Sequence, residues 1–141
     1  MAQDPKLAHL AQVRLFSSCT KKELEQISRA ADEITVPAGK DLVVEGQYGH
    51  EFFLILDGTA TVRRNGRKVA TLGPSEYFGE LAVLARSVRN ATVTADTPMT
   101  LLVLGQREFA AVIEEVPRLA GKLLTQMADR VREADERALS H

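Results

Sequence analysis

Residues Tyr77 to Ala95, with the sequence YFGELAVLARSVRNATVTA, guide the interpretation of the whole chain. The stretch begins with an aromatic pair and Gly79, which indicate a turn, and residues 80–85 then have the composition of one or two helical turns. A loop with two arginines follows, and the stretch ends in alternating β-branched residues that are typical of a strand. Because so short a helix is unstable alone in water, the surrounding chain must hold it.

The start of this short helix is suited to an anion. Its first backbone N–H groups have no partner within the helix, and they lie beside a glycine. Arg89, nine residues after Glu80, can bind a phosphate through its planar guanidinium. The Glu80 carboxylate would repel a phosphate in contact with it, so we expect it to accept a hydrogen bond from another part of the ligand, such as a sugar hydroxyl.

These residues resemble the phosphate-binding cassette of the cyclic nucleotide-binding domain family. FGELAV at residues 78–83 matches the first half of the family pattern, and RNATV at residues 89–93 matches the second half at the family spacing. The resemblance implies that Glu80 binds the ribose 2′-hydroxyl, that Arg89 binds the cyclic phosphate, and that backbone N–H groups of residues 79–82 help to hold both. The residues expected to form the site are Phe78, Gly79, Glu80, Leu81, Ala82, Arg89, Asn90 and Ala91.

The chain departs from the family pattern at three positions. Val88 stands where the family usually has Pro, and Asn90 stands where cAMP-type modules often have Ala or Ser and cGMP-type modules have Thr. In the family the last helix often covers the base, and the position of a base-contacting hydroxyl falls near Ala134, which cannot form that bond. Base recognition is left to packing by Met127 or Val131, to Asn90, or to no specific contact.

The composition limits the class of protein. The chain has 141 residues, of which 45% are hydrophobic, and a net charge of −1, so we expect one soluble globular domain that binds neither nucleic acid nor a membrane. The N-terminus lacks the features of a signal peptide. The single cysteine, Cys19, fits a reducing cytoplasm and excludes an internal disulfide. No Cys or His pair has metal-ligand spacing, so no metal site and no cofactor are predicted.

The order of periodicities predicts the fold class. Leu7 to Leu15 is a short helical piece, and Thr20 with Glu23 forms a capping box for a helix of about three turns. From Asp32 the apolar period changes to two, with hairpin turn signals at residues 57–58 and 65–66. This pattern predicts a mainly β protein with flanking helices, an antiparallel β-roll of the jelly-roll type with about eight strands.

The helical period returns at Gln106, and Pro117 suits the first turn of a second C-terminal helix. We therefore expect a single domain over residues 1–141, divided into an N-terminal helical segment (1–19), a capping helix with the β-roll (20–105) and C-terminal helices (106–141). The last helix carries an apolar seam at heptad spacing, which predicts contact with a second copy or an effector protein. The seam consists of Ala120, Leu124, Met127, Val131, Ala134 and Ala138.

The leading functional hypothesis is a non-catalytic cytoplasmic sensor that binds a cyclic nucleotide, cAMP rather than cGMP. An alternative is a fold that has lost ligand binding and acts as a dimerisation or protein-interaction module. A jelly-roll metalloenzyme would need a cluster of His and carboxylate ligands on its strands, and the predicted strands contain none. A transcription factor would need a DNA-reading helix pair, and the residues up to His141 contain no basic recognition segment.

Overall fold

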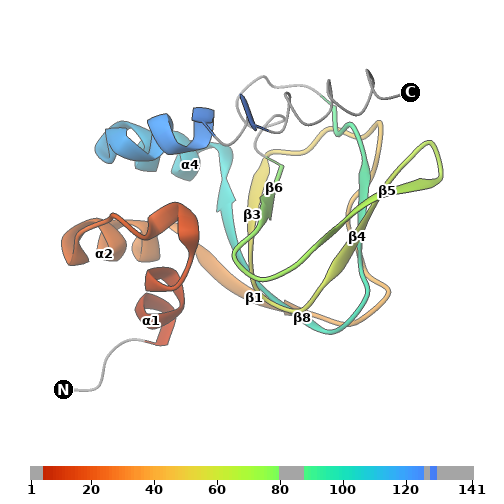
Figure 1. The fold of residues 1–141 in the computed structure, drawn as a ribbon, viewed down its shortest axis with the longest axis horizontal. Helices are drawn as coiled ribbons and strands as arrows, with labels where there is room; N and C mark the ends of the chain where they lie inside the picture. The colour runs from red at the N-terminus through yellow and green to blue at the C-terminus, as the bar shows by residue number, and fades with distance from the viewer. Residues whose placement is uncertain (1–4, 80–87, 126–127, 130–141) are drawn as a thin grey trace.

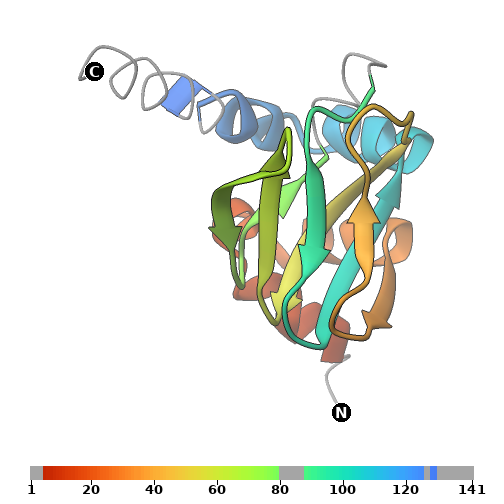
Figure 2. The same cartoon turned by 90° about the vertical axis from the view of Figure 1, so that its right-hand side faces the viewer.

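The computed structural model describes residues 5–79, 88–125 and 128–129. Two four-stranded antiparallel sheets face each other, and helices cover the outer side of one of them (Figure 1). The sheet beneath the helices has the strand order β1-β8-β3-β6 and is called the helix-covered sheet below. The other, called the open sheet, has the order β2-β7-β4-β5 and faces the viewer in Figure 2. The predicted β-roll with about eight strands is confirmed.

The chain enters through three short helical pieces, which are α1 (Pro5–Ala11), a 3₁₀ turn (Arg14–Phe16) and α2 (Lys21–Ala30). The capping box at the start of α2 is present as predicted. The Glu23 backbone N–H donates to the Thr20 hydroxyl at 3.2 Å, and the Thr20 backbone N–H donates to the Glu23 carboxylate at 2.8 Å. These two bonds satisfy backbone donors that the first helical turn leaves without partners.

The two central strands of the helix-covered sheet, β3 and β8, have runs of consecutive apolar residues. In β3 all four residues from Phe52 to Ile55 are buried, since the strand has a packed layer on both faces. The strands of this sheet are β1 (Asp32–Val36), β3 (Glu51–Asp57), β6 (Tyr77–Phe78) and β8 (Met99–Gly105). The sequence indicated a turn at the aromatic pair, but Tyr77 and Phe78 instead form a two-residue strand that pairs with Leu54 and Phe53.

The open sheet is less buried, and among its strands β7 alternates between half-buried and buried residues. Its strands are β2 (Asp41–Val43), β4 (Ala60–Arg64), β5 (Arg67–Leu72) and β7 (Thr92–Ala95). Strands β4 and β5 are joined by the predicted Asn65-Gly66 hairpin turn, with φ of 54° and 77° at these residues. The hairpin predicted at residues 57–58 is wrong, because β3 and β4 belong to different sheets and Gly58 instead lies where the chain passes from one sheet to the other. No helix among the described residues covers the outer face of this sheet.

Two hydrophobic clusters result from this layering. The first lies between the helices and the helix-covered sheet, and it includes Phe16, Ile27, Phe52 and Leu102. The second lies between the two sheets and is formed by Phe53, Ile55, Ala60, Phe78, Val93, Ala95, Met99 and Leu101. Cys19 and Leu24 both pack at the edge of the first cluster, as a small apolar residue beside the helix cap is expected to do.

The C-terminal helices close the first cluster. Helix α4 (Gln106–Glu115) buries Phe109, whose ring centroid lies 4.7 Å from that of Phe52. A second helix begins at Pro117, as predicted, and residues 117–125 and 128–129 are helical. This helix buries Leu119 and Leu123 in the first cluster, whereas Leu124 is 64% exposed. Ala120 of the predicted heptad seam is half-buried. The other four seam residues, Met127, Val131, Ala134 and Ala138, and the predicted short helix at residues 80–85 lie outside the described residues.

Candidate ligand-binding site

Arg89 lies in the segment that enters β7, and its backbone joins two loops. Its N–H donates to the Gln47 carbonyl at 2.8 Å, and its carbonyl accepts from the Gly46 N–H at 2.8 Å. A further bridge pairs Val88 with Tyr48. Because the loop after β2 and the loop before β7 are paired in this way, the Arg89 backbone is held on both sides.

The Arg89 side chain is buried, with only 6% of the residue exposed. Its Nη2 donates to the Glu51 carbonyl at 2.9 Å, and its Nη1 donates to the Gly79 carbonyl at 3.3 Å. Glu51 begins β3, and Gly79 follows β6 directly, so the guanidinium reaches from the open sheet to one end of the helix-covered sheet. A buried cation needs such partners because the loss of hydration is costly.

Two glycines make room for this guanidinium. A Cβ on Gly49 would lie 2.6 Å from Cζ and 2.5 Å from Nη2 of Arg89, so any side chain there would displace the guanidinium. Gly79 has φ of +91°, and a Cβ there would lie 2.6 Å from the Glu51 carbonyl oxygen and 2.7 Å from Arg89 Nη1. Backbone therefore approaches the guanidinium at two points where only glycine fits.

This arrangement has the properties of an anion site. A guanidinium carries five N–H donors in one plane, and contacts with two carbonyls fix the orientation of that plane. Gly79 follows β6 directly and has a left-handed φ of 91°, at the point where the sequence predicts a helix N-terminus. A planar cation with a fixed orientation is suited to a phosphate group, which it can bind through two parallel hydrogen bonds.

The other residues predicted to form the site have different surroundings. Phe78 is buried and stacks on Phe53, with ring centroids 4.9 Å apart, and Ala91 is also buried. Asn90 is exposed, and its carbonyl accepts a hydrogen bond from Arg64 Nε at 3.1 Å. The structure thus brings Arg89 and Gly79 into direct contact, while Phe78 and Ala91 contribute to the core around them. Glu80, Leu81 and Ala82 lie outside the described residues.

The sequence analysis missed two participants, Gly49 and the Glu51 carbonyl. Gly49 had a usable signal, since it is the second glycine of a short loop that precedes a buried strand. The Glu51 carbonyl had none, because every residue type carries the same backbone oxygen. The contact depends on how the loop before β3 meets the segment before β7, which is a property of the tertiary structure.

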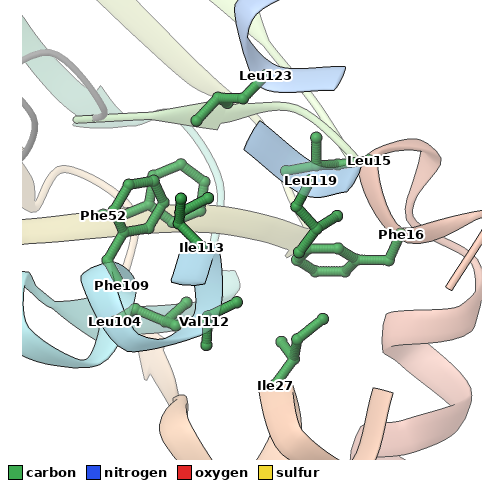
Figure 3. A pocket seen from close by; sticks show the side chains of 10 residues that line it. All are labelled: Leu15, Phe16, Ile27, Phe52, Leu104, Phe109, Val112, Ile113, Leu119 and Leu123. Carbon is green, nitrogen blue, oxygen red and sulfur yellow. The ribbon is translucent and has the colours of Figure 1, made fainter. Parts of the chain in front are cut away.

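A small cavity lies elsewhere, inside the first hydrophobic cluster (Figure 3). Its volume is about 10 Å³, which is at the lower limit of what one water molecule needs, and all its lining residues are apolar. It cannot accept a nucleotide. The lining residues are Leu15, Phe16, Ile27, Phe52, Leu104, Phe109, Val112, Ile113, Leu119 and Leu123.

The described residues offer neither a metal site nor a membrane span. Within residues 5–79, 88–125 and 128–129, no three His, Cys, Asp or Glu side chains are grouped in a way that could hold a metal ion. No helix in the same ranges has the length and apolar character that crossing a membrane requires.

Comparison with known proteins identifies the family. A model of the cyclic nucleotide-binding domain matches residues 33–116, more than half of the chain. The chain belongs to the cyclic nucleotide-binding domain family, whose domain is a regulatory module.

Three similar proteins illustrate the family. The cAMP-dependent protein kinase regulatory subunit of Schizosaccharomyces pombe is 36% identical over 87% of this chain and 28% of its own length. The cGMP-dependent protein kinase of Eimeria tenella is 29% identical over 92% of this chain and 12% of its own. The solved structure of the Thermus thermophilus catabolite activator protein superimposes with a TM-score of 0.80 and 31% sequence identity. The match includes 86% of this chain and 59% of the activator chain. The chain thus spans less than a third of the length of the two kinase-related proteins.

Proposed function

We propose that this chain is a non-catalytic sensor that binds a cyclic purine mononucleotide, with cAMP preferred to cGMP. The observation that carries the proposal is the buried Arg89 guanidinium, which is oriented by the carbonyls of Glu51 and Gly79. The names of two relatives support the ligand class, since one is a cAMP-dependent kinase regulatory subunit and the other a cGMP-dependent kinase.

In this proposal Arg89 binds the cyclic phosphate. Glu80 accepts a hydrogen bond from the ribose 2′-hydroxyl, and the backbone N–H groups of residues 79–82 hold the ribose and phosphate. Phe78 and Ala91 support this segment from the core, and Asn90 lies at its rim. Ligand binding shifts the population toward a state in which the C-terminal helix covers the base, which changes the surface offered to a second copy or an effector.

Titration calorimetry with cAMP on the wild type and on Arg89→Ala tests this role. The substitution removes a charge-assisted pair worth on the order of 1.5–3 kcal/mol, which corresponds to roughly ten- to a hundredfold in affinity. Arg89→Lys keeps the charge but loses the planar geometry, so its affinity should be intermediate. Arg63→Ala removes an exposed arginine from the same domain and serves as the matched control.

A parallel titration with cGMP tests the base preference. Urea unfolding of each variant shows whether the variant is folded, so that weaker binding can be assigned to the lost contact. Equal affinity of the wild type and Arg89→Ala for cAMP would refute the role of Arg89. Absence of any heat with millimolar cAMP or cGMP on the wild type would refute the sensor function as a whole.

A further inference from the structure

The hairpin of β4 and β5 ends in a cluster of positive charge. Arg63 and Arg64 precede the Asn65-Gly66 turn, and Arg67 and Lys68 follow it. All four side chains are exposed, and the hairpin extends beyond the body of the roll (Figure 1). These four residues are called the basic hairpin tip below. The chain as a whole has a net charge of −1, so this cluster is a local excess of positive charge.

The charges face each other across the hairpin. Arg64 pairs with Arg67, and Arg63 pairs with Lys68, so both rungs next to the turn place like charges directly opposite each other. Such pairs destabilise a hairpin. Among the described residues no carboxylate forms an ion pair with any of the four cations. The Glu45 carboxylate, which accepts from the Asn65 N–H, offsets part of this repulsion, and an external anion would relieve the remainder.

The tip has a fixed shape. The Asn65 N–H donates to the Glu45 carboxylate at 2.9 Å, and Arg64 Nε donates to the Asn90 carbonyl at 3.1 Å. The two-residue turn itself is tight, with left-handed φ at Asn65 and Gly66. A partner that binds this tip would not have to order it first, which lowers the entropic cost of association.

The tip continues into a sheet edge. Strand β5 is the outermost strand of the open sheet in the described part of the chain, and all its residues except Leu72 are exposed. Positive charge on an edge can also serve to prevent pairing with other chains. Here, however, Arg67 and Lys68 occupy only the end next to the turn, and Ala70 and Thr71 leave the rest of the edge uncharged. Within residues 5–79, 88–125 and 128–129 no strand pairs with this edge, and its charge is concentrated at one end.

We propose that the basic hairpin tip and the edge of β5 together bind an extended acidic segment of a partner protein. The partner adds a strand to β5 through main-chain hydrogen bonds, and its carboxylates neutralise the tip. An anionic membrane is the less suitable occupant, because the turn consists of Asn65 and Gly66 and offers no apolar side chain for insertion.

The test measures binding of a fluorescein-labelled ten-residue peptide of alternating Glu and Thr to the full chain by anisotropy. The double variant Arg67→Glu and Lys68→Glu should bind at least tenfold more weakly than the wild type. The control variant Lys21→Glu and Lys22→Glu makes the same change in charge at exposed positions on α2 and should stay within twofold. Equal binding by the tip variant and the wild type would overturn the proposal.

Stability provides an independent readout. Arg67→Glu and Lys68→Glu turn both like-charge rungs into opposite-charge rungs, so the melting temperature should stay the same or rise while peptide binding falls. Loss of binding together with a lower melting temperature would contradict the proposed cause.

Two further probes separate strand pairing from simple charge attraction and from a membrane. A peptide with the same side chains but with every backbone amide N-methylated has no N–H donor left for a sheet edge and should bind at least fivefold more weakly. Equal binding of the two peptides would overturn the pairing at the β5 edge. Binding to phosphatidylserine vesicles without binding to the acidic peptide would overturn the proposal in favour of a membrane.

Discussion

The two sheets of the roll use the same antiparallel pairing but differ in what covers them. In the helix-covered sheet, β3 and β8 are apolar over consecutive residues because helices pack on one face and the open sheet on the other. In the open sheet, β5 is exposed along nearly its whole length. The difference indicates that a strand with consecutive apolar residues is packed on both faces, whereas a strand without such a run is packed on one face at most.

The candidate site lies where the two sheets meet. Arg89 belongs to the segment that enters the open sheet, and its guanidinium donates to carbonyls at the ends of two strands of the helix-covered sheet. One side chain therefore couples the rigid, doubly packed layer to the more exposed layer. A substitution at this junction is expected to affect both the stability of the fold and the binding of ligand. Which of the two effects is larger depends on the residue that is replaced.

The largest expected effect contrasts the two sheets directly. Leu102→Ala removes a fully buried side chain from the helix-covered sheet and should lower the free energy of unfolding by about 2–5 kcal/mol. Leu72→Ala removes the same atoms from the open sheet, where the leucine is only half-buried, and should cost clearly less. Urea unfolding of both variants measures the difference. Equal losses would mean that the two sheets are packed alike.

The next effect separates stability from binding at the junction. Gly79→Ala places a Cβ against the Glu51 carbonyl oxygen at a left-handed φ and should destabilise the fold by roughly 1–3 kcal/mol. Gly49→Ala has no left-handed φ to strain and meets the Arg89 guanidinium instead of backbone. It should therefore cost less stability than Gly79→Ala, while the displaced guanidinium lowers cAMP affinity roughly tenfold, the equivalent of one weakened charge-assisted bond. Unfolding and calorimetry on the two variants test this pair. Gly121→Ala, which meets no neighbouring atom, is the control.

A smaller effect concerns the helices that cover one sheet only. Thr20→Ala removes the N-cap of α2 and should lower the free energy of unfolding by about 1 kcal/mol. Ser18→Ala, two residues earlier and also exposed, should change it much less. Hydrogen exchange would follow amides in α2 and in β4. Preferential loss of protection in α2 is expected, and a larger loss in β4 would contradict the assignment of the helices to the first cluster.

The smallest effect is chemical and leaves stability unchanged. Burial raises the pKa of the Cys19 thiol, and the nearby Glu23 carboxylate raises it further. The reactive thiolate is therefore scarcer at any pH below this pKa than in an exposed cysteine. Alkylation by iodoacetamide at pH 8 should be slower in the native protein than in 6 M urea. A native rate equal to the rate in urea would show that the helices do not shield this side of the sheet.

Much of the fold could be predicted from the sequence because its signals are local. The capping box at Thr20 and the Asn65-Gly66 turn depend on neighbours within three residues, and both are present as predicted. Strand β6 was missed because two residues are too few to show a period of two. Its existence depends on pairing with β3, more than twenty residues earlier.

The candidate site was predictable only in part. The spacing of Gly79 and Arg89 suggested an anion site, and the structure places these residues in contact. The loop position of Gly49 marked it as a residue of interest, but its contact with the guanidinium could not be predicted, because Arg89 comes from a distant segment of the chain. Likewise the sequence showed two pairs of basic residues around the turn, but only the register revealed that like charges face each other.

The anchoring of Arg89 by the carbonyls of Glu51 and Gly79 has a practical consequence for mutational scanning. A scan that truncates side chains one by one leaves every main-chain oxygen in place, so it would score position 51 as tolerant although its oxygen orients the guanidinium. Substitutions of the position 51 side chain during evolution would likewise leave the carbonyl oxygen, and so the guanidinium, in place. The support of this cation would become visible only through insertions, deletions or backbone ester substitution, which move or weaken the oxygen itself.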